Sequence, residues 1–388
     1  MKRILFALAV LLASVAANAQ TPYEIECAIN ACLERQNALG VEYAVVKDGK
    51  IVAIGSAGVK DTCGTAWSAD HHEIFPMASI SKSYTAIAIL QLVEQGLISL
   101  DDDIQQYVDV PVVNPAYPDT KITVRMFLDH TSTIQGGGIN LRSKDLDPKL
   151  NKDLTKRYGD YEPGTKYYYS NLCYNVLGGV VERVSGERFD RYVKAHILDP
   201  LGLTASFNAA DLDSTNFEDI WIYDKKAQAF KAKDRFYFKP VVKSDKEYQM
   251  GEDGEEFYGS YGMKTDIKSL ARYMMMHMND GELDGVRILS PEYSRLMKSG
   301  HIWGAEGKGK QRHYAFGLFE SDNWIPAKTV VGHTGFISGI ATAMFFNHEE
   351  GWGICTIYNA FNTQDRLAMQ TDMFRTLHGL FIGYSRTE

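Results

Sequence analysis

The stretch SISKSYTAIAILQLVEQG, residues 79–96, is apolar almost all round and lacks the alternation of a half-buried strand. Its length and composition predict a helix buried in the core of the fold and stopped by Gly96. Ser79 and Lys82 open this helix three residues apart, so their side chains share one face, one turn apart. An ammonium group in such a place needs a physical reason, because burial disfavours its charged form.

The two ends of the chain carry similar patterns on either side of this helix. A hairpin is predicted near the start by the dipeptide Asp48-Gly49 between two apolar runs. The predicted elements of the ends are a helix at about 23–37, strands at 41–46, 50–54, 340–346 and 352–358, and a closing helix at 363–381. Strands at both ends favour one antiparallel sheet with a helical lobe inserted between them, an α+β fold.

The middle of the chain is expected to be mainly helical. Helices are predicted at 124–129, at 171–184 before Gly186, at 187–198 before Pro200, and at 266–278 behind an N-cap at Thr265. Residues 204–258 mix charged and aromatic side chains without clear periodicity, and we assign no chemistry to them. The sheet lobe is therefore expected at about 23–78 and 315–388, the helical lobe at about 97–260, and a binding cleft between the lobes.

Residues 1–19 have the pattern of a secretory signal peptide: Lys2 and Arg3, an apolar run, and small residues at a cleavage site ending with Ala19. The remaining domain, 20–388, is then expected in the periplasm or outside the cell, without an integral membrane segment. The whole chain has 41 basic and 49 acidic residues, a net charge of −8, and losing Lys2 and Arg3 leaves 39 against 49, or −10. This balance gives no sign of nucleic-acid binding. The oligomeric state is left open.

Five cysteines, an odd number, leave at least one unpaired within the chain. Cys173 and Cys355 lie in apolar segments and are interpreted as small buried hydrophobic residues. Cys63 is a candidate to bridge to Cys27 or Cys32, and the sequence does not decide between pairing and free thiols.

Three short segments carry side chains suited to acyl transfer. A buried lysine with a lowered pKa can act as a base toward the hydroxyl of Ser79, and backbone N–H groups at the helix start can hold an oxyanion. Tyr169-Ser170-Asn171 follows a Pro-Gly turn, and His333-Thr334-Gly335 follows Gly332, where backbone can approach a ligand closely. A hydroxyl, an amine, a phenol and backbone donors together need no metal or other cofactor.

In this order, Ser-x-x-Lys at 79–82, Tyr-x-Asn at 169–171 and His-Thr-Gly at 333–335 resemble the signature elements of the serine β-lactamase and penicillin-binding-protein superfamily. The resemblance is strongest to the branch of class C β-lactamases, D-alanyl-D-alanine carboxypeptidases, D-aminopeptidases and related esterases. The segment MFLDHTS, 126–132, is similar to the family's Leu-x-His-Thr-Ser. The resemblance covers roughly residues 24–380 and implies the β-lactamase/transpeptidase-like fold.

Carried over by position, the resemblance implies a role for each motif residue. Ser79 is the acyl-accepting nucleophile, Lys82 and Tyr169 share the work of general base and acid, and Asn171 orients Lys82 and the substrate. The oxyanion would be held by the backbone N–H groups of Ser79 and Phe336. His333, Thr334 and Gly335 would bind and orient the substrate, a small peptide, amide or ester of possible cell-wall origin.

Two positions depart from the family pattern. Penicillin-recognising members usually carry lysine where this chain has His333, and a histidine with a pKa near 6.5 attracts a carboxylate less strongly at pH 7. This difference favours a peptidase, amidase or esterase over a true class C-like β-lactamase, which is the alternative enzyme. Thr133 replaces a common glycine and puts the local turn in question. Aromatic residues near the expected cleft, among them Tyr258 and Tyr261, suggest an apolar or aromatic substrate side chain.

Other kinds of function are weighed against this one. A Ser-His-Asp hydrolase with a nucleophile elbow is disfavoured because no serine lies in Gly-x-Ser-x-Gly. Metalloenzyme motifs such as His-Glu-x-x-His are absent from the sequence. A non-catalytic relative that binds cell-wall fragments remains the second alternative, since a fold does not fix a function.

Overall fold

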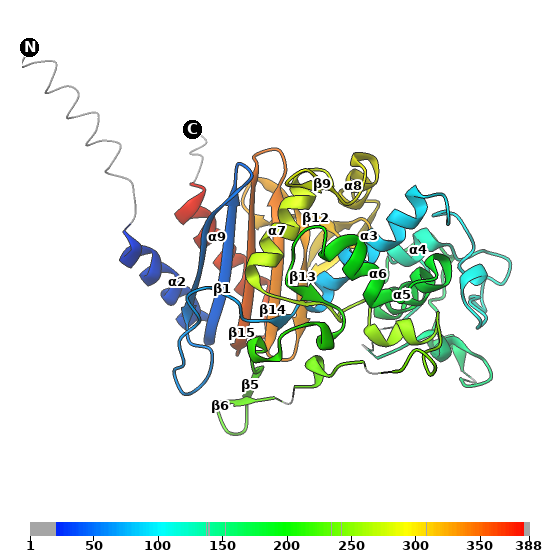
Figure 1. The fold of residues 1–388 in the computed structure, drawn as a ribbon, viewed down its shortest axis with the longest axis horizontal. Helices are drawn as coiled ribbons and strands as arrows, with labels where there is room; N and C mark the ends of the chain where they lie inside the picture. The colour runs from blue at the N-terminus through cyan, green and yellow to red at the C-terminus, as the bar shows by residue number, and fades with distance from the viewer. Residues whose placement is uncertain are drawn as a thin grey trace, which may run out of the picture.

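Strands from both ends of the chain pair in one antiparallel sheet, which confirms the predicted α+β fold (Figure 1). The computed structural model describes residues 21–383 except 137, 139, 152, 234, 242 and 308. The predicted signal peptide, 1–19, lies outside the described residues. The strand nearest the N-terminus pairs with the last strand of the chain, Val41 opposite Tyr358 and Val45 opposite Ile354.

The sheet has eight strands, and its order places the N-terminal hairpin at one edge. In spatial order the strands are β10 (Ile302–Gly307), β11 (Lys310–Tyr314), β12 (Phe319–Ile325), β13 (Lys328–Ile337), β14 (Ile340–Asn347), β15 (Trp352–Phe361), β1 (Ala38–Lys47) and β2 (Lys50–Gly58). All neighbours in it are antiparallel. The sheet therefore starts at Ile302, earlier than the predicted boundary of 315, because the polar hairpin of β10 and β11 has no strong apolar alternation.

Helices cover both faces of the sheet (Figure 1). The helices are α2 (Pro22–Gln36), α3 (Ser81–Glu94), α4 (Val124–Leu128), α5 (Asn171–Ser185), α6 (Phe189–Val193), α7 (Ile267–Met278), α8 (Pro291–Lys298) and α9 (Arg366–Phe381). Helices α2 and α9 pack on one face, where Tyr43, Val45 and Ile354 meet Leu33 and Phe374. Helix α7 packs on the other face and joins it to the core of the helical lobe. Alternate side chains of β1 thus serve two cores.

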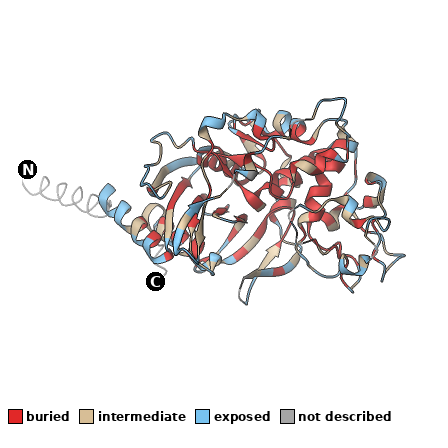
Figure 2. Ribbon diagram, turned by 90° about the horizontal axis from the view of Figure 1, so that it is seen from below, coloured by how far each residue is buried: buried red, intermediate tan, exposed pale blue. Residues whose placement is uncertain are grey.

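Helix α3 runs through the middle of the helical lobe, as its apolar sequence predicts. Its residues from Ser81 to Leu92 are all buried, and it packs against α5 and α6. Buried residues are concentrated in the helices inside this lobe (Figure 2). The helix ends before Gly96, whose φ of +72° is in the left-handed region that favours glycine. The buried helix thus carries the predicted Ser-x-x-Lys element into the junction of the two lobes.

Two predicted helices differ from the structure in detail. The segment 187–198 forms the short helix α6 followed by one π-helical turn, Lys194–Leu198, so it is not one continuous α-helix. Helix α7 begins behind Asp266, whose carboxylate accepts from the Ser269 N–H at 2.6 Å. The predicted N-cap, Thr265, belongs to the preceding short strand, where its hydroxyl donates to Thr204 O. Threonine and aspartate both suit an N-cap position. Because Thr265 is the last residue of strand β7, the helix begins after Asp266.

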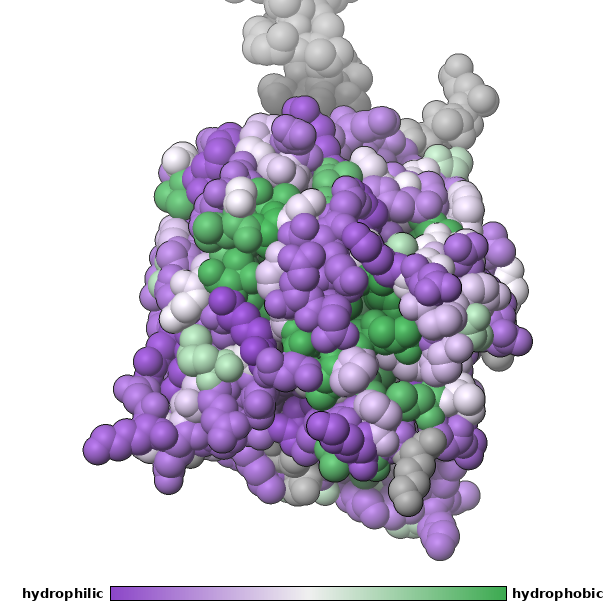
Figure 3. Space-filling model, turned by 90° about the vertical axis from the view of Figure 1, so that its right-hand side faces the viewer, coloured by the Kyte–Doolittle hydropathy of each residue, from purple (hydrophilic) through white to green (hydrophobic). Residues whose placement is uncertain are grey.

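The segment between α6 and α7 is mostly loop. It contains the short strands β4 (Ala205–Ser206), β5 (Trp221–Asp224), β6 (Ala229–Ala232) and β7 (Lys264–Thr265), the last pairing with β3 (Phe75–Pro76) as well as β4. A further small hairpin joins β8 (Glu282–Leu283) to β9 (Val286–Arg287). The end of the molecule formed by the helical lobe shows mainly hydrophilic side chains with separate hydrophobic areas between them (Figure 3).

All five cysteines are free thiols in the structure, which corrects the hypothesis of a bridge from Cys63. Cys32 is buried between α2 and α9, where its thiol donates to Asp372 at 3.2 Å, while Cys63 is exposed in the loop after β2. Cys27 is exposed on α2.

Over the residues described, no helix has the length and hydropathy that crossing a bilayer would take.

Candidate active site

Ser79 lies in a short turn of 3-10 helix, Ala78–Ile80, that leads directly into α3. The preceding residue, Ala78, has a φ of +49°, an uncommon conformation for a residue with a side chain. Strand β13 packs closely against this turn at Gly335. Glycine has no Cβ atom, and one added at this position would lie 2.2 Å from the Met77 carbonyl oxygen. Thr342 of β14 also donates to that oxygen at 2.9 Å. The sheet therefore fixes the position of the serine.

The amine of Lys82 is placed to exchange a proton with the Ser79 hydroxyl. Its Nζ lies 3.2 Å from Ser79 Oγ and donates to Asn171 Oδ1 at 2.8 Å and to the Ser260 carbonyl at 2.9 Å. Lys82 is fully buried, whereas Ser79 is partly exposed. Ser79 thus has contact with solvent while the amine beside it is kept from water.

Burial holds the pKa of Lys82 well below its usual range, and the nearby positive charge of Arg312 lowers it further. No carboxylate among the described residues forms an ion pair with Lys82. Its hydrogen-bond partners are three neutral oxygens, which do not require a charged amine. Lys82 therefore has the environment of a neutral base.

Tyr169 comes from the segment before α5 and completes the cluster. Lys82 Nζ lies 4.6 Å from the centre of its ring. Burial raises the pKa of Tyr169, while a hydrogen bond with Ser79 and the charge of Arg312 act in the opposite direction. The structure thus brings Ser79, Lys82, Tyr169 and Asn171 together at the start of α3, although they are about 90 residues apart in the chain.

The segment MFLDHTS, 126–132, packs against Tyr169 through His130. His130 is buried, its ring centre lies 4.4 Å from that of Tyr169, and its Nδ1 accepts from the Ser170 N–H at 3.2 Å. Thr133 has a φ of +67°, in the left-handed region that favours glycine. Here the Thr133 hydroxyl accepts from Asn114 Nδ2 at 3.0 Å, so the turn keeps a partner for its buried hydroxyl.

The His-Thr-Gly element lies on β13 beside the serine, but the histidine side chain faces inward. His333 is 1% exposed, and its Nε2 lies 3.1 Å from the hydroxyl of Tyr314 on β11. Burial and the charges of Arg312 and Lys82 hold the pKa of His333 well below its usual value. It stays a prediction that a substrate contacts His333, Thr334 and Gly335. The role of the Phe336 backbone N–H in holding an oxyanion also stays a prediction.

Two neighbours of the site were not found from the sequence. The carbonyl of Ser260 binds Lys82 through the backbone, which leaves no residue-type signal. Arg312 on β11 inserts its guanidinium among the site's aromatic rings, and its distance along the chain from the motifs hides it. Within the described residues no group of three or more His, Cys, Asp and Glu side chains could hold a metal ion.

An antiparallel sheet, an inserted helical lobe and a serine-lysine pair at the head of a buried helix define the β-lactamase/transpeptidase-like fold. The chain belongs to the Beta-lactamase family, whose model matches residues 25–377.

Individual relatives are distant in sequence. Protein flp of Staphylococcus aureus (strain N315) is 23% identical over 346 residues, which cover 87% of this chain and 62% of that protein. The chain thus spans about three fifths of the length of these curated relatives. The octameric penicillin-binding protein homologue from Pyrococcus abyssi has a TM-score of 0.75 at 22% identity, covering 94% and 78% of the two chains. The D-amino acid amidase from Ochrobactrum anthropi SV3, complexed with L-phenylalanine amide, has a TM-score of 0.71 at 18% identity, covering 92% and 97%. These structures share the fold.

Proposed function

We propose that this protein hydrolyses amides or esters through an acyl-enzyme on Ser79, and that it acts outside the cytosol after loss of residues 1–19. The observation that carries the proposal is the buried amine of Lys82, which has no carboxylate partner among the described residues and lies 3.2 Å from the hydroxyl of the partly exposed Ser79. Lys82 or Tyr169 takes the proton of Ser79 as its oxygen attacks the substrate carbonyl. The same groups return a proton to the leaving amine or alcohol, and water then releases the acid.

Peptidase, amidase or esterase activity is favoured over β-lactam hydrolysis. His333 replaces the lysine that usually attracts the β-lactam carboxylate, and its pKa is held well below its ordinary value, so the imidazole is neutral at pH 7. The likeness in fold to a D-amino acid amidase supports the same direction. A class C-like β-lactamase and a non-catalytic binder of cell-wall fragments are the alternatives.

A fluorophosphonate probe tests for the nucleophile, and a substrate panel tests the reaction. We expect mass spectrometry to find one adduct, on Ser79, in the wild-type protein. We also expect turnover of neutral ester and D-amino-acid amide substrates to exceed turnover of nitrocefin. The absence of an adduct at every pH would favour the binder, and faster nitrocefin hydrolysis would favour the β-lactamase.

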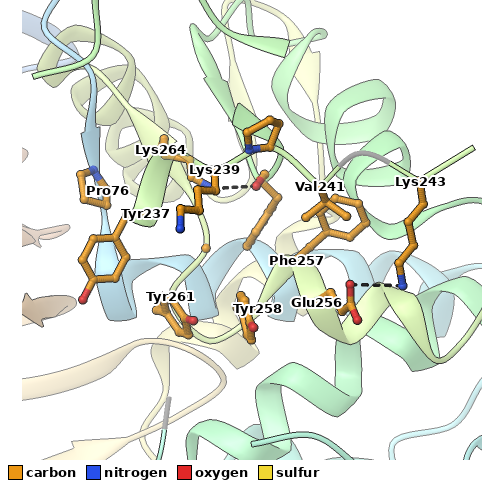
Figure 4. A pocket seen from close by; sticks show the side chains of 13 residues that line it. Pro76, Tyr237, Lys239, Val241, Lys243, Glu256, Phe257, Tyr258, Tyr261 and Lys264 are labelled. Carbon is orange, nitrogen blue, oxygen red and sulfur yellow. Dashed lines mark hydrogen bonds and ion pairs between the residues drawn. The ribbon is translucent and has the colours of Figure 1, made fainter. Parts of the chain in front are cut away.

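A pocket of about 300 Å³ is lined by residues close in the chain to the proposed catalytic cluster, though by none of the cluster itself, and it supports a substrate with an apolar or aromatic side chain. Tyr237, Phe257, Tyr258 and Tyr261 form much of its wall, and Pro76, three residues before Ser79, lies at its edge (Figure 4). Tyr261 directly follows Ser260, whose carbonyl binds Lys82. The pocket wall is therefore three residues from the proposed catalytic cluster along one segment of the chain and one residue from it along another.

Phenylalanyl esters are accordingly expected to have a kcat/KM about tenfold or more above that of alanyl esters, because a phenyl ring gains apolar burial in the pocket. Val241 also lines the pocket, so Val241→Phe should fill it and lower the ratio toward one. Val52→Phe, at an exposed position on β2, is the matched control and should leave the ratio unchanged. A wild-type preference for alanyl esters would contradict an aromatic subsite.

A further inference from the structure

Arg312 places a guanidinium group inside the aromatic cluster behind the proposed catalytic residues. Its Cζ lies between 4.5 and 5.9 Å from the centres of four rings, those of Phe319, Tyr169, Tyr314 and Tyr167. Nη2 donates to the Tyr167 hydroxyl at 2.9 Å. The ring of Tyr169 thus has two cationic groups beside it, Lys82 Nζ at 4.6 Å and Arg312 at 5.4 Å.

This guanidinium has no carboxylate partner in the described part of the chain. Its Nε is buried without a hydrogen bond, and its polar contact is the neutral hydroxyl of Tyr167. The glutamates on the two strands beside β11 have other partners, Glu306 with Trp324 at 2.8 Å and Glu320 with His313 at 3.1 Å. Arg312 is half-buried as a residue, and its Nε is fully buried. Cationic nitrogens in such surroundings are usually paired with an acid, so an unpaired one next to a reaction centre requires an explanation.

The charge of Arg312 acts on the groups that surround Ser79. The titratable groups around Lys82 come from several elements. Tyr169 precedes α5, and Cys173 and Tyr174 lie in its first turn. The others are His130 after α4, His333 on β13 and Arg312 on β11. None of them is a carboxylate. The two imidazoles are buried, and their pKa values lie well below the usual range, so they carry no charge at neutral pH. A guanidinium, in contrast, stays charged in any protein environment.

We propose that Arg312 is a positioning residue that supplies the fixed positive charge of this active site, in place of the cation that His333 does not provide. From behind Tyr169 it favours the deprotonated forms of Lys82 and Tyr169, which are the forms able to accept the proton of Ser79. The inference rests on the proposed acyl-transfer function. It does not require the substrate to be charged, because Arg312 acts through the phenol and the amine.

The sign of its effect is the same for either base. Removing the positive charge makes protonation of Lys82 easier and ionisation of Tyr169 harder, so both groups lose their protons at higher pH. The acid limb of kcat/KM for the neutral ester p-nitrophenyl butyrate should therefore move upward by about one pH unit in Arg312→Met, on the order expected for one unit charge in a buried site. Methionine keeps most of the apolar contact with the four rings.

Matched variants separate charge from packing. Arg312→Lys keeps the cation and should retain the wild-type limb, while Arg312→Gln is a second neutral variant should Arg312→Met fail to fold. Arg191→Met removes an exposed arginine paired with Asp245 and should leave the profile unchanged. The proposal would be overturned if the acid limb of the pH profile stays at the wild-type pH in the neutral variants. It would also be overturned if this limb moves as far in Arg312→Lys as in Arg312→Met.

A second measurement is independent of turnover. In protein labelled with 13C at the lysine Cε, the Lys82 signal, assigned through its loss in Lys82→Ala, should titrate at higher pH in Arg312→Met than in the wild type. An unchanged Lys82 titration would overturn the role of Arg312 even if the enzyme is active. A wild type that shows neither turnover nor a fluorophosphonate adduct would instead remove the acyl-transfer function, whatever the lysine signal shows.

Discussion

Ser79→Ala is expected to lower kcat/KM for ester and amide substrates by about 10⁴-fold or more, because no other group can form the acyl-enzyme. The folded structure should be little affected. Ser79 is partly exposed, and the hydrogen bond that its hydroxyl shares with Lys82 is long, at 3.2 Å. Steady-state kinetics together with thermal unfolding of the same preparation measure both effects.

Ser81→Ala is the matched control, two residues further along the same turn. The Ser81 hydroxyl is buried and accepts from the Met263 N–H at 2.9 Å, away from Lys82. Its loss leaves a buried donor without a partner and should cost about 1–3 kcal/mol of unfolding free energy. Activity per folded molecule should stay near the wild-type value. A Ser79→Ala protein that keeps substantial turnover would mean that the nucleophile lies elsewhere.

The sequence was sufficient to predict the elements whose signals are local. The all-round apolar helix after Ser79, the strands at both chain ends and the three motifs each depend on residue types within a short window, and the structure confirms the fold. The proximity of Ser79, Lys82, Tyr169 and Asn171 followed only from the resemblance, since spacing along the chain does not bring residue 82 to residue 171.

Features that depend on distant backbone or on surroundings were missed. Ser260 contributes a carbonyl, which any residue type has, so no sequence pattern marks it. Arg312 lies on β11, a polar strand that gives little apolar alternation, and its role depends on a ring of its own strand and on rings from two other segments. The choice of Asp266 over Thr265 as N-cap likewise depends on pairing of β7 with β3 and β4. Such features are decided by tertiary contacts.

Lys82→Ala is expected to lower kcat/KM about 10³-fold, because the Ser79 hydroxyl loses the amine 3.2 Å away that can take its proton. It leaves Ser79, Tyr169 and the backbone donors in place, so a slow reaction through Tyr169 can persist. Activity near the wild-type level would show that Tyr169 alone is the base. Lys298→Ala is the control, since Lys298 is also a buried lysine but pairs with Asp280 far from the cluster.

The same variant also tests the protonation state of Lys82 through stability. The folded protein releases the Lys82 proton below the usual lysine pKa of 10.5, whereas the unfolded chain keeps it up to that value. Between the two values the unfolded chain binds one proton more, so the unfolding free energy of the wild type should rise with pH, relative to Lys82→Ala, by about 1.4 kcal/mol per unit. Lost hydrogen bonds shift the difference between the two proteins but do not change with pH. Denaturant unfolding at pH 7.5, 8.5 and 9.5 gives this difference, and a constant value would mean that Lys82 is charged in the folded protein and is not the base that Ser79 requires.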